Sequence, residues 1–394
     1  MGRLTLMAHN GPMAHNHLGV GMIGYAFMGA AHSHAWRTAP TFFDLSLRPR
    51  LTAICGRDRE AANVVGDKFG WESVETDWRK LIERDDIDLI DICTPGDTHA
   101  EIAISALEAG KHVLCEKPLA NTVEEAERMA AAAADAARQG VRAMVGFTYR
   151  RTPAVSFARE LVNAGRIGTI RHVRGQYLQD WLSDMETPLT WRMDKAKAGS
   201  GALGDIGAHV LDMAQFVTGS AITSVSGVLK TFVDSRPVSA ESSERGPVTV
   251  DDAVAFTAGF DNGALGVFEA TRMATGRRNA LRLEINGTKG SLAFDFEDMN
   301  YLEYFDATED PAVAGFRRID VTQESHPYIS AWWPPGHGLG YEHGFTHQVV
   351  DLLKSIADGV DPTPSFADGL AVQRILGAIE ASSADGATHQ IGTG

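Results

Sequence analysis

The sequence has few cysteines and no long apolar run. Its three cysteines, Cys55, Cys93 and Cys115, are scattered and form no CxxC pair. This excludes a disulfide scaffold and a structural zinc site of the usual spacing, and it favours free thiols in a reducing cytoplasm. No stretch approaches the roughly 18 apolar residues that a membrane-spanning helix needs. We therefore expect a cytoplasmic protein, with residues 1–17 as a flexible tail because they contain no signal-peptide core.

The sequence also has fewer basic than acidic side chains. The chain has 36 Lys and Arg against 51 Asp and Glu, which gives a net charge of −15. Binding to nucleic acid or to an anionic membrane needs a positive field, so the overall charge argues against both kinds of partner. A local site for one phosphate group stays open. With 394 residues, of which 44% are hydrophobic, the chain is long enough for two globular domains.

Residues 18–147 alternate short apolar runs with helical segments. Continuous apolar runs are typical of parallel strands that helices cover on both faces, and strands that alternate with helices indicate βαβ units. The pattern predicts a doubly wound α/β domain of the Rossmann type. The expected strands are 18–23, 51–55, 89–93, 112–115 and 142–145, and the expected helices are 30–39, 59–69, 99–109 and 123–138.

Residues 148–394 follow a different pattern, in which apolar and polar residues alternate with a period of two. This predicts an α+β domain with an open, mostly antiparallel sheet and helices on one face. Residues 236–247 are polar and rich in Ser, Pro and Glu, so we expect an exposed loop there. The expected strands are 170–179, 222–233, 253–260, 265–271, 281–285 and 291–296, and the expected helices are 153–163, 205–217, 343–357 and 370–382.

The first strand-to-helix turn carries the glycine pattern of a dinucleotide site. A literal GxGxxG at residues 19–24 falls inside the strand, so the next register is the useful one. In that register Gly24 makes the tight turn, Gly29 permits close helix packing, and Ala26 replaces the glycine that faces a pyrophosphate. The helix that follows offers free N–H groups to the pyrophosphate. The predicted cofactor turn is Gly24, Tyr25, Ala26, Phe27, Met28 and Gly29.

The end of the second strand bears on the choice between NAD and NADP. An acidic residue there binds the ribose hydroxyl of NAD, whereas arginine suits the 2′-phosphate of NADP. This sequence has Gly56 followed by Arg57, which favours NADP without excluding NAD. Asp58 either reaches the ribose or caps the next helix.

Three further motifs carry chemical side chains. Thr94-Pro95 with His99, and Glu116-Lys117-Pro118, follow two neighbouring strands of the first domain. The carboxyl ends of parallel strands are where doubly wound sheets bind ligands. Gly204-Asp205 and His209 open a helix of the second domain, and a spacing of four places Asp205 and His209 on one helix face.

These residue types suit the oxidation of a secondary alcohol. Such a reaction removes a proton from oxygen, and a histidine with a pKa near neutrality is a good acceptor, so His209 is the predicted base. Lys117 can stabilise the developing alkoxide. Asp205 can orient the imidazole or hold a second substrate hydroxyl. The hydride itself leaves with a nicotinamide cofactor.

Other residues are weaker candidates. Thr94 and Pro95 can shape the nicotinamide-ribose pocket, Glu116 can bind a ribose hydroxyl, and His99 either joins this pocket or simply begins a helix. Aromatic faces and polar forks are typical of sugar pockets. The predicted substrate residues of this kind are Tyr149, Arg150, Gln179, Trp181, Trp191 and Arg192. No HExxH motif occurs, and we predict no metal site.

The combination of Glu116-Lys117-Pro118 with Gly204-Asp205 and His209 resembles the Gfo/Idh/MocA oxidoreductase family. Residues 147–154, 177–181, 199–205 and 364–369 extend the resemblance over nearly the whole chain, most closely to members that oxidise inositols and anhydrosugars. The resemblance implies an NAD(P)-dependent dehydrogenase of a sugar, a levoglucosan-like anhydrosugar or an inositol-like cyclitol. It also implies a homodimer or homotetramer formed through the C-terminal sheet. Ala26 and Gly56 depart from the family pattern and bear on the cofactor.

Two rival functions fit the same fold. One is a glycosidase that uses tightly held NAD for transient oxidation, which would retain its cofactor and release no NADH. The other is a nucleotide-bound sugar sensor without catalysis, since a fold does not dictate a function. Sensors tend to lose the lysine–histidine pair, whereas Lys117 and His209 are both present.

Overall fold

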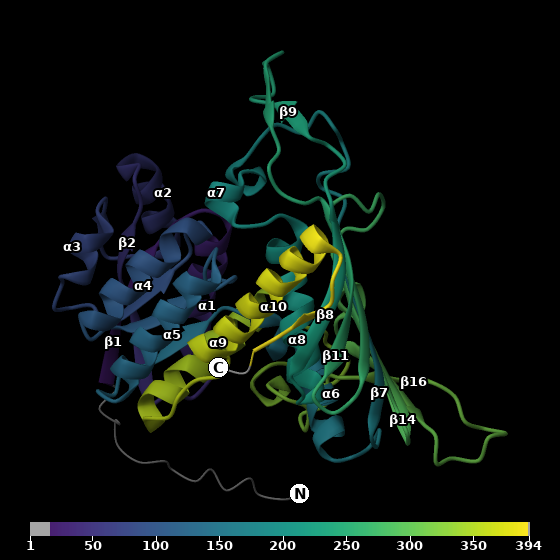
Figure 1. Ribbon diagram of the computed structural model, residues 1–394. Coiled ribbons are helices and arrows are strands. Elements are labelled where there is room, and N and C mark those ends of the chain that lie inside the picture. Colours follow the sequence, from purple (N-terminus) through teal and green to yellow (C-terminus); the bar gives the residue numbers. More distant parts are fainter. Residues whose placement is uncertain (1–15, 393–394) are drawn as a thin grey trace, which may run out of the picture.

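The computed structural model describes residues 16–392 and contains two large β-sheets with helices between them (Figure 1). The first sheet has six parallel strands in the order β3-β2-β1-β4-β5-β6. This is the order of a doubly wound dinucleotide-binding domain, as the sequence predicts. Its strands are β1 (Asn16–Ile23), β2 (Leu47–Cys55), β3 (Val74–Glu75), β4 (Leu89–Ile92), β5 (His112–Cys115) and β6 (Ala143–Val145).

Five helices accompany this sheet, and their ends follow local sequence signals. Asp58 caps the second helix by accepting from the backbone N–H of Glu60 and Ala61, so the structure shows the capping role, and the ribose contact stays a prediction. Thr122 and Glu125 form a capping box at the last helix. The helices are α1 (Phe27–Phe42), α2 (Arg59–Phe69), α3 (Trp78–Ile82), α4 (His99–Glu108) and α5 (Val123–Ala137).

The second sheet has nine strands in the order β16-β15-β14-β13-β7-β12-β11-β8-β17. Only the β7–β12 pair is parallel among the strand pairs described, so the sheet is mixed and mostly antiparallel, which confirms the predicted class. Its strands are β7 (Ile170–Leu178), β8 (Ile222–Lys230), β11 (Ala253–Phe260), β12 (Leu265–Thr271), β13 (Ala280–Gly287), β14 (Gly290–Asp295), β15 (Tyr301–Asp306), β16 (Arg317–Asp320) and β17 (His389–Gln390).

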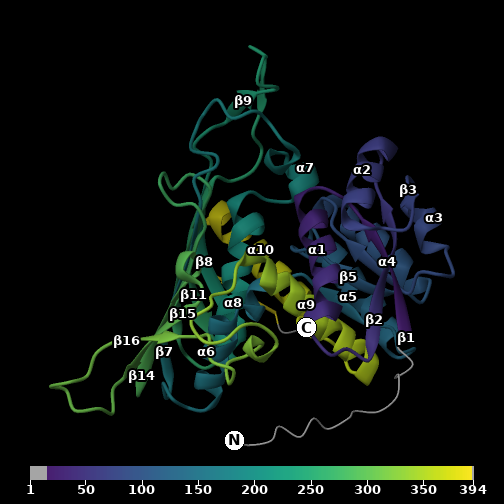
Figure 2. The same cartoon turned by 180° about the vertical axis from the view of Figure 1, so that it is seen from behind.

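Helices cover one face of this sheet, the face that looks toward the first domain (Figures 1 and 2). The longer helices after residue 147 are α6 (Pro153–Asn163), α8 (Ala208–Thr218), α9 (Tyr341–Asp358) and α10 (Phe366–Asp385). The short helices are η1 (Gly96–Thr98) in the first domain and, after residue 147, η2 (Thr148–Arg151), η3 (Trp191–Met193), α7 (Lys195–Ala198), η4 (Leu203–Gly207), η5 (Phe296–Asp298) and η6 (Ile329–Ala331). The other face of the sheet is left open to solvent.

The last two long helices return to the first domain. α9 packs on α1, and its Phe345, Val349 and Leu353 belong to the same apolar cluster as Val20 and Trp36 of the first domain. α10 packs on both α5 and β8. The predicted division at residues 147 and 148 therefore separates the two sheets, while α9 completes the core of the first one.

The segment 236–247, predicted to be an exposed loop, is largely exposed, but its ends pair with each other. This segment forms a hairpin of β9 (Ser235–Pro237) and β10 (Arg245–Pro247), which projects from the top of the molecule in Figure 1. Arg236 is fully buried, and its guanidinium donates to the carbonyls of Leu182 and Asp184. A buried arginine with carbonyl partners is what holds the polar segment in place.

Other differences concern the ends of the chain and short elements. Residues 1–15 lie outside the described residues, and β1 begins at Asn16, inside the predicted tail. β3, α3, β15, β16 and β17 were not predicted. Within residues 16–392 no helix is long and apolar enough to cross a membrane.

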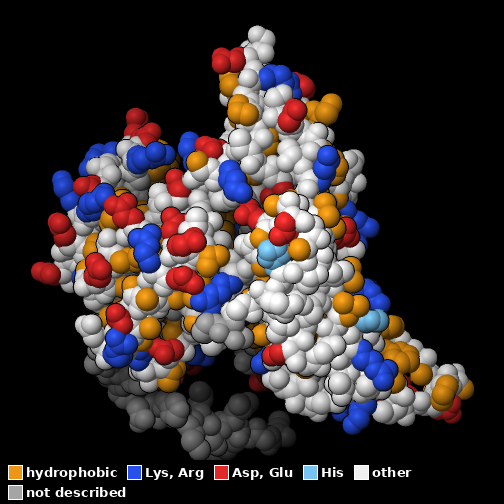
Figure 3. Space-filling model, viewed as in Figure 1, with side chains coloured by type: hydrophobic (Ala, Val, Ile, Leu, Met, Phe, Trp, Pro, Cys, Tyr) orange, Lys and Arg blue, Asp and Glu red, His pale blue; other side chains and the backbone are white. Residues whose placement is uncertain are grey.

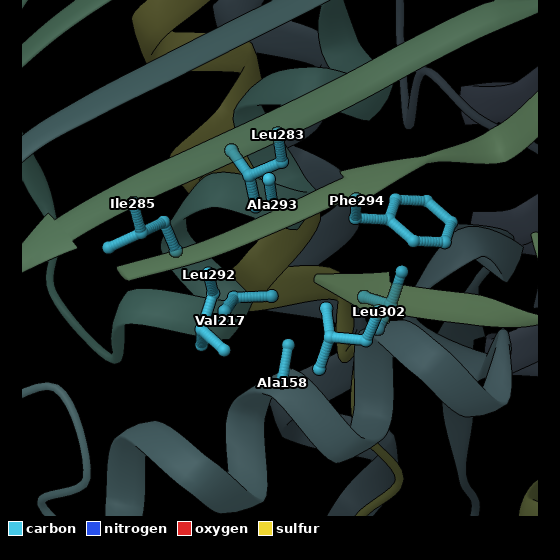
Figure 4. Close-up of a pocket in the computed structure, with 9 residues that line it drawn as sticks. Ala158, Val217, Leu283, Ile285, Leu292, Ala293, Phe294 and Leu302 are labelled. Atoms are coloured by element: carbon cyan, nitrogen blue, oxygen red, sulfur yellow. The ribbon is translucent and has the colours of Figure 1, made fainter. Parts of the chain in front are cut away.

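A cleft of about 400 Å³ opens between the two domains and is lined by Thr122, Lys195 and Glu380 among other residues. On the face in Figure 3, acidic and basic side chains are interspersed over the first domain. A gap of about 10 Å³ lies between α6, α8 and strands β13–β15 (Figure 4), lined by Ala158, Val217 and Leu292 among other apolar residues. Its size and apolar lining make it a packing gap with room for at most about one water molecule.

Candidate active site

The turn between β1 and α1 has the geometry of a pyrophosphate site. Gly24 has a φ of +103°, and a Cβ there would lie 2.8 Å from the carbonyl of Cys93. A Cβ on Gly29 would lie 2.3 Å from the carbonyl oxygen of Gly24. Both glycines are therefore required by the turn. The N-cap residue Ala26 makes no side-chain cap, which leaves the first N–H groups of a 16-residue helix free for a phosphate. The turn fits an NAD-type cofactor.

The other residues of this turn differ in exposure. Tyr25 and Met28 pack against the apolar core of the first domain. Phe27 is 66% exposed, and its ring stacks on Tyr341 at a centroid distance of 6.2 Å. Phe27 therefore reaches from the cofactor turn toward α9.

The structure gives a steric reason for Gly56. A Cβ at this position would lie 1.9 Å from Cε1 of Tyr25, because the tyrosine ring lies across the glycine. The space that suggested room for a 2′-phosphate is thus filled by Tyr25. Arg57 is exposed, and the preference for NADP stays a prediction.

Lys117 and Asp205 meet at the boundary between the two domains. The Nζ of Lys117 donates to the backbone carbonyl of Asp205 at 2.5 Å and lies 3.5 Å from its carboxylate. The carboxylate also lies 3.6 Å from a guanidinium nitrogen of Arg272. Burial alone would raise the pKa of Asp205, but Lys117, Arg272 and Arg192 together hold it below its usual range. Asp205 is therefore an ionised acceptor between cations.

The segment that carries Asp205 is a π-helical turn, Leu203–Gly207, which runs directly into α8. The carboxylate of Asp251 fixes this turn by accepting from the backbone N–H of Gly201 at 2.7 Å and of Leu203 at 2.8 Å. A Cβ on Gly201 would lie 1.8 Å from the carbonyl oxygen of Asp251, so the close approach requires glycine. Such turns often occur at functional sites.

The π turn overturns one predicted contact. The sequence allows Asp205 either to orient the His209 ring from one α-helical turn away or to hold a second substrate hydroxyl. A π turn has a wider repeat, and Asp205 faces Lys117 and Arg272 instead of the ring. Nδ1 of His209 is buried with no hydrogen-bond partner among residues 16–392. The ring is held by aromatic contacts, with Tyr149 edge-on at 4.6 Å and Phe147 at 6.2 Å.

The same surroundings set the charge of His209. Burial first and the nearby Lys117 second lower its pKa well below the ordinary value of 6.5. The imidazole is therefore neutral at pH 7 and ready to accept a proton. The residue as a whole is partly exposed, and because Nδ1 is buried, Nε2 is the nitrogen that can face a substrate.

A chain of hydrogen bonds continues from Tyr149 along the edge of the second sheet. Its hydroxyl lies 2.6 Å from that of Tyr177, which donates to Asn279 at 2.8 Å. Gln179 also donates to Asn279, and the indole N–H of Trp181 donates to Gln179 at 3.0 Å. The structure thus brings the predicted residues Tyr149, Gln179 and Trp181 together on one side of His209.

Arg192 and Trp191 are two further predicted residues in the region of Asp205. Arg192 lies close enough to help lower the pKa of Asp205, and its guanidinium stacks on the ring of Trp191 at 4.5 Å. Both side chains are partly buried. Their roles in substrate binding stay predictions.

Arg150 has a different role from the predicted one. It is buried and makes a two-pronged ion pair with Asp212 of α8, at 2.8 and 2.5 Å, and a longer one with Asp368 of α10. All its charge is directed to these carboxylates, so it joins helices of the second domain. We remove Arg150 from the substrate site.

His99 and Glu116 are likewise engaged by the protein itself. The His99 ring is 1% exposed and lies 2.9 Å from the carbonyl of Thr94 and 3.0 Å from that of Pro118. It thereby joins the two loops that flank the cofactor site. The carboxylate of Glu116 contacts His32 and the backbone N–H of Lys117. His99 and Glu116 therefore hold the loops around the predicted cofactor pocket. Their polar atoms are bonded within the protein and are not directed to a cofactor.

The turn at Thr94 and Pro95 lies where the sequence places it, after β4 and beside Lys117. The Thr94 hydroxyl is 2.6 Å from that of Thr98. Both Thr94 and Pro95 are partly exposed, so they stay candidates for the nicotinamide-ribose pocket.

Sequence reasoning missed Arg272, Tyr177 and Asn279. Arg272 is fully buried, donates to the carbonyl of Asp251 and lies 5.4 Å from the ring of Trp181. Tyr177 could have been predicted, because it stands two residues before the predicted residue Gln179. Alternate residues of an extended strand lie on the same face. Asn279 and Arg272 come from distant segments and gave no such signal.

Known proteins resemble the chain over nearly its whole length. Residues 18–147 match the family description "Oxidoreductase family, NAD-binding Rossmann fold", and residues 155–293 match "GFO/IDH/MocA C-terminal domain". Levoglucosan dehydrogenase of Pseudarthrobacter phenanthrenivorans is 43% identical over 380 residues, which are 93% of this chain and 96% of that protein. These matches confirm the resemblance read from the motifs.

Solved structures agree with this result. An oxidoreductase domain protein from Kribbella flavida has 68% identity and a TM-score of 0.94, covering 96% of this chain and 100% of that one. A levoglucosan dehydrogenase in complex with NADH and levoglucosan has 43% identity and a TM-score of 0.92, covering 96% of this chain and 100% of that one.

Proposed function

This chain belongs to the Gfo/Idh/MocA oxidoreductase family, and we propose that it oxidises a secondary hydroxyl of a sugar with NAD(P) as hydride acceptor. Levoglucosan is the first candidate substrate, because a relative named levoglucosan dehydrogenase aligns with nearly the whole chain. The observation that carries the proposal is the meeting of Lys117 from the first domain with Asp205 and His209 from the second.

The residues present supply the parts that such an oxidation needs. When bound at the glycine turn, NAD supplies the hydride acceptor. The substrate hydroxyl loses its proton to Nε2 of His209, whose lowered pKa keeps the ring neutral. The Nζ of Lys117 faces the oxygen that becomes negative as the proton leaves, and it stabilises this charge. Asp205, held ionised by Lys117 and Arg272, accepts a hydrogen bond from a second hydroxyl.

The surrounding side chains suit a small polyol. The ring of Trp181, which is 39% exposed, offers a flat face to C–H groups of a sugar ring. Gln179, Tyr149 and Arg192 offer donors and acceptors to hydroxyls. This mixture is typical of carbohydrate sites, and it supports a neutral polar substrate.

We also propose that the protein assembles as a homodimer or homotetramer through the open face of the second sheet. Val228, Leu265 and Val267 on this face are 66%, 49% and 51% exposed. Apolar side chains at this exposure on β8 and β12, the two strands that flank β11, mark an interaction surface.

The direct test is an absorbance assay for NADH formation with NAD and with NADP, against levoglucosan, inositols and simple sugars. We expect turnover with at least one sugar or cyclitol. Lys117→Met should lower kcat by at least about 100-fold, the scale for losing one charge-stabilising donor, while NADH binding, measured by fluorescence, is retained. Lys80→Met, the same change at an exposed lysine of α3, should leave kcat unchanged.

Two results would contradict this function. Release of a free sugar from a glycoside without net NADH would identify a glycosidase that recycles its cofactor. Binding of NADH and sugar with no chemistry, and no difference between wild type and Lys117→Met, would identify a sensor.

A further inference from the structure

A buried group of charged side chains lies beneath the active site and takes no part in the mechanism above. His32 of α1 is 1% exposed, Asp91 of β4 is fully buried and Glu116 at the end of β5 is 5% exposed. Nδ1 of His32 lies 3.0 Å from both carboxylate oxygens of Asp91, and Nε2 lies 3.1 Å from Oε1 of Glu116. One imidazole therefore bridges two carboxylates from two neighbouring strands.

The geometry determines the protonation of His32. When both carboxylates are ionised, each can only accept a hydrogen bond, and both ring nitrogens then carry hydrogen, which makes the ring an imidazolium. Burial works against this charge, but Asp91 outweighs it, and the pKa of His32 lies well above 6.5. The other groups around the ring are neutral: the Trp36 indole donates to Asp91 at 2.7 Å, and Tyr341 and Phe345 of α9 pack nearby.

The group is not arranged as a metal site, although donor atoms of His32, Asp91 and Cys93 lie within 4.8 Å of one another. Both nitrogens of His32 are already directed to carboxylates. Burial raises the pKa of the Cys93 thiol to about 12, so it remains a thiol and donates weakly to Asp91 at 3.6 Å. His32, Asp91 and Glu116 are better described as an ion-pair cluster, with the Cys93 thiol beside it.

Glu116 carries this cluster directly to the catalytic lysine. Its Oε1 contacts His32, and its Oε2 accepts from the backbone N–H of Lys117 at 3.2 Å. Gly146 on the adjoining segment leaves room for the carboxylate, since a Cβ there would lie 2.7 Å from Oε1. His32 itself stands three residues after Gly29 on the helix that begins at the cofactor turn. The bridge thus connects the pyrophosphate turn to the Lys117 turn.

We propose that His32, as an imidazolium held between Asp91 and Glu116, is a positioning residue that sets the Lys117 turn relative to the dinucleotide helix. This inference rests on the proposed function, since its kinetic consequence is the alignment of substrate carbon and nicotinamide for hydride transfer. A shift of about 1 Å in such an alignment lowers rates roughly 100-fold. The proposal places the effect on the chemical step rather than on binding.

The first test is independent of activity. In [15N]histidine-labelled protein without cofactor, the His32 signals, identified by their loss in His32→Gln, should show both ring nitrogens protonated at about pH 8. Glu116→Gln removes one carboxylate and should lower the pH at which His32 loses its proton. A neutral His32 at about pH 7 in wild type would overturn the proposal, whatever the substrate of the enzyme.

The second test is kinetic and uses a designed rescue. In His32→Gln a single amide cannot donate to both carboxylates, so kcat should fall roughly 10- to 100-fold. The KM for sugar and the Kd for NADH should change less than about threefold, and the deuterium isotope effect on kcat should rise. In His32→Gln/Glu116→Gln, residue 32 can donate to Asp91 and accept from the new amide at 116, so part of kcat should return.

Each outcome of the kinetic test either supports or contradicts the positioning role of His32. A folded His32→Gln with the wild-type kcat and isotope effect would show a merely structural role, as would a double variant slower than both single ones. If His32→Gln does not fold, the Glu116→Gln variant alone must show the loss of kcat with unchanged NADH affinity. Failure of the wild type to oxidise any sugar would contradict the proposed function, but it would not affect the NMR measurement of His32 protonation.

Discussion

At the scale of single residues, His209 makes the sharpest prediction. A base must be unprotonated to accept the alcohol proton, so kcat/KM for oxidation rises with pH through the pKa of the free enzyme's base. Burial and Lys117 lower that pKa well below 6.5, which places the rising limb on the acid side of pH 6.5 and leaves a plateau above it. His209→Ala should lower kcat/KM by roughly 100- to 10,000-fold and flatten the limb.

The control for this change is His34→Ala, at an exposed position of α1, which should keep both the rate and the limb. If His209→Ala retains the same acid limb and most of the rate, then Lys117 or a water molecule is the base, and His209 is only a substrate contact. Profiles must be compared under conditions in which hydride transfer limits the rate.

Gly56 gives a second prediction at this scale. In Gly56→Asp the new carboxylate repels a 2′-phosphate, so the kcat/KM ratio of NAD to NADP should rise about 5- to 150-fold, equal to roughly 1–3 kcal/mol. Any side chain here must also displace the Tyr25 ring. Gly56→Ala isolates that displacement and should weaken both cofactors alike. An unchanged ratio in Gly56→Asp, measured against Gly56→Ala, would refute the role of this position in cofactor choice.

The residues with catalytic side chains could be predicted from the sequence, but the hydrogen-bond partners of the candidate side chains could not. Lys117, Asp205 and His209 stand in short motifs whose residue types carry the reaction. Arg150 and His99 also have suitable types, yet they are committed to Asp212 and to two backbone carbonyls respectively. Arg150 is occupied by Asp212, which lies more than 60 residues further along the chain. A local sequence pattern contains no information about such a distant partner.

At the scale of elements, the π turn is the feature on which the site depends. Asp251→Ala would leave the N–H groups of Gly201 and Leu203 buried without their acceptor. The unfolding free energy should fall by about 2–4 kcal/mol, the scale for two lost bonds to a charged group. Because the turn presents Asp205 to Lys117, kcat should fall as well. Denaturant titration and steady-state kinetics measure the two effects.

The matched control is Asp77→Ala, which removes a carboxylate that caps α3 through the backbone N–H of Arg79. It should cost about 1 kcal/mol of stability and leave kcat unchanged. Asp251→Asn keeps one acceptor and should lie between wild type and Asp251→Ala. A stable, fully active Asp251→Ala would show that the turn does not depend on this carboxylate.

Elements were predictable where a clear apolar pattern is bounded by turn residues. The ranges of α2, α6, β5, β11 and β12 follow directly from their apolar periods and turn residues. β3 and α3 have two and five residues, too few for any period to show. The π turn was missed for another reason, since its wider repeat depends on Asp251, about 50 residues further along the chain.

At the scale of the whole molecule, the active site exists only because the two sheets face each other across helices. Lys117 comes from the first sheet, Asp205 and His209 from a helix of the second domain, and α9 closes the core of the first sheet from the far end of the chain. The family fold made this arrangement predictable in outline. The return of α9 to the first domain was not, because its apolar face in the sequence does not say which core it joins.

The open face of the nine-stranded sheet makes the last prediction. Val228, Leu265 and Val267 are exposed on strands that flank β11, through the pairs Val228–Ala255 and Val267–Thr257. A dimer that buries these side chains gains roughly 25 cal/mol for each Å² of apolar surface removed from water, whereas an aspartate in the same place must be desolvated. Light scattering should therefore find a dimer or tetramer for wild type and a smaller species for Val228→Asp/Val267→Asp. Val64→Asp, at a valine of α2 that is 64% exposed, controls for added charge and should keep the wild-type mass. A wild-type monomer, or an unchanged mass in the double variant, would rule out this face as the interface.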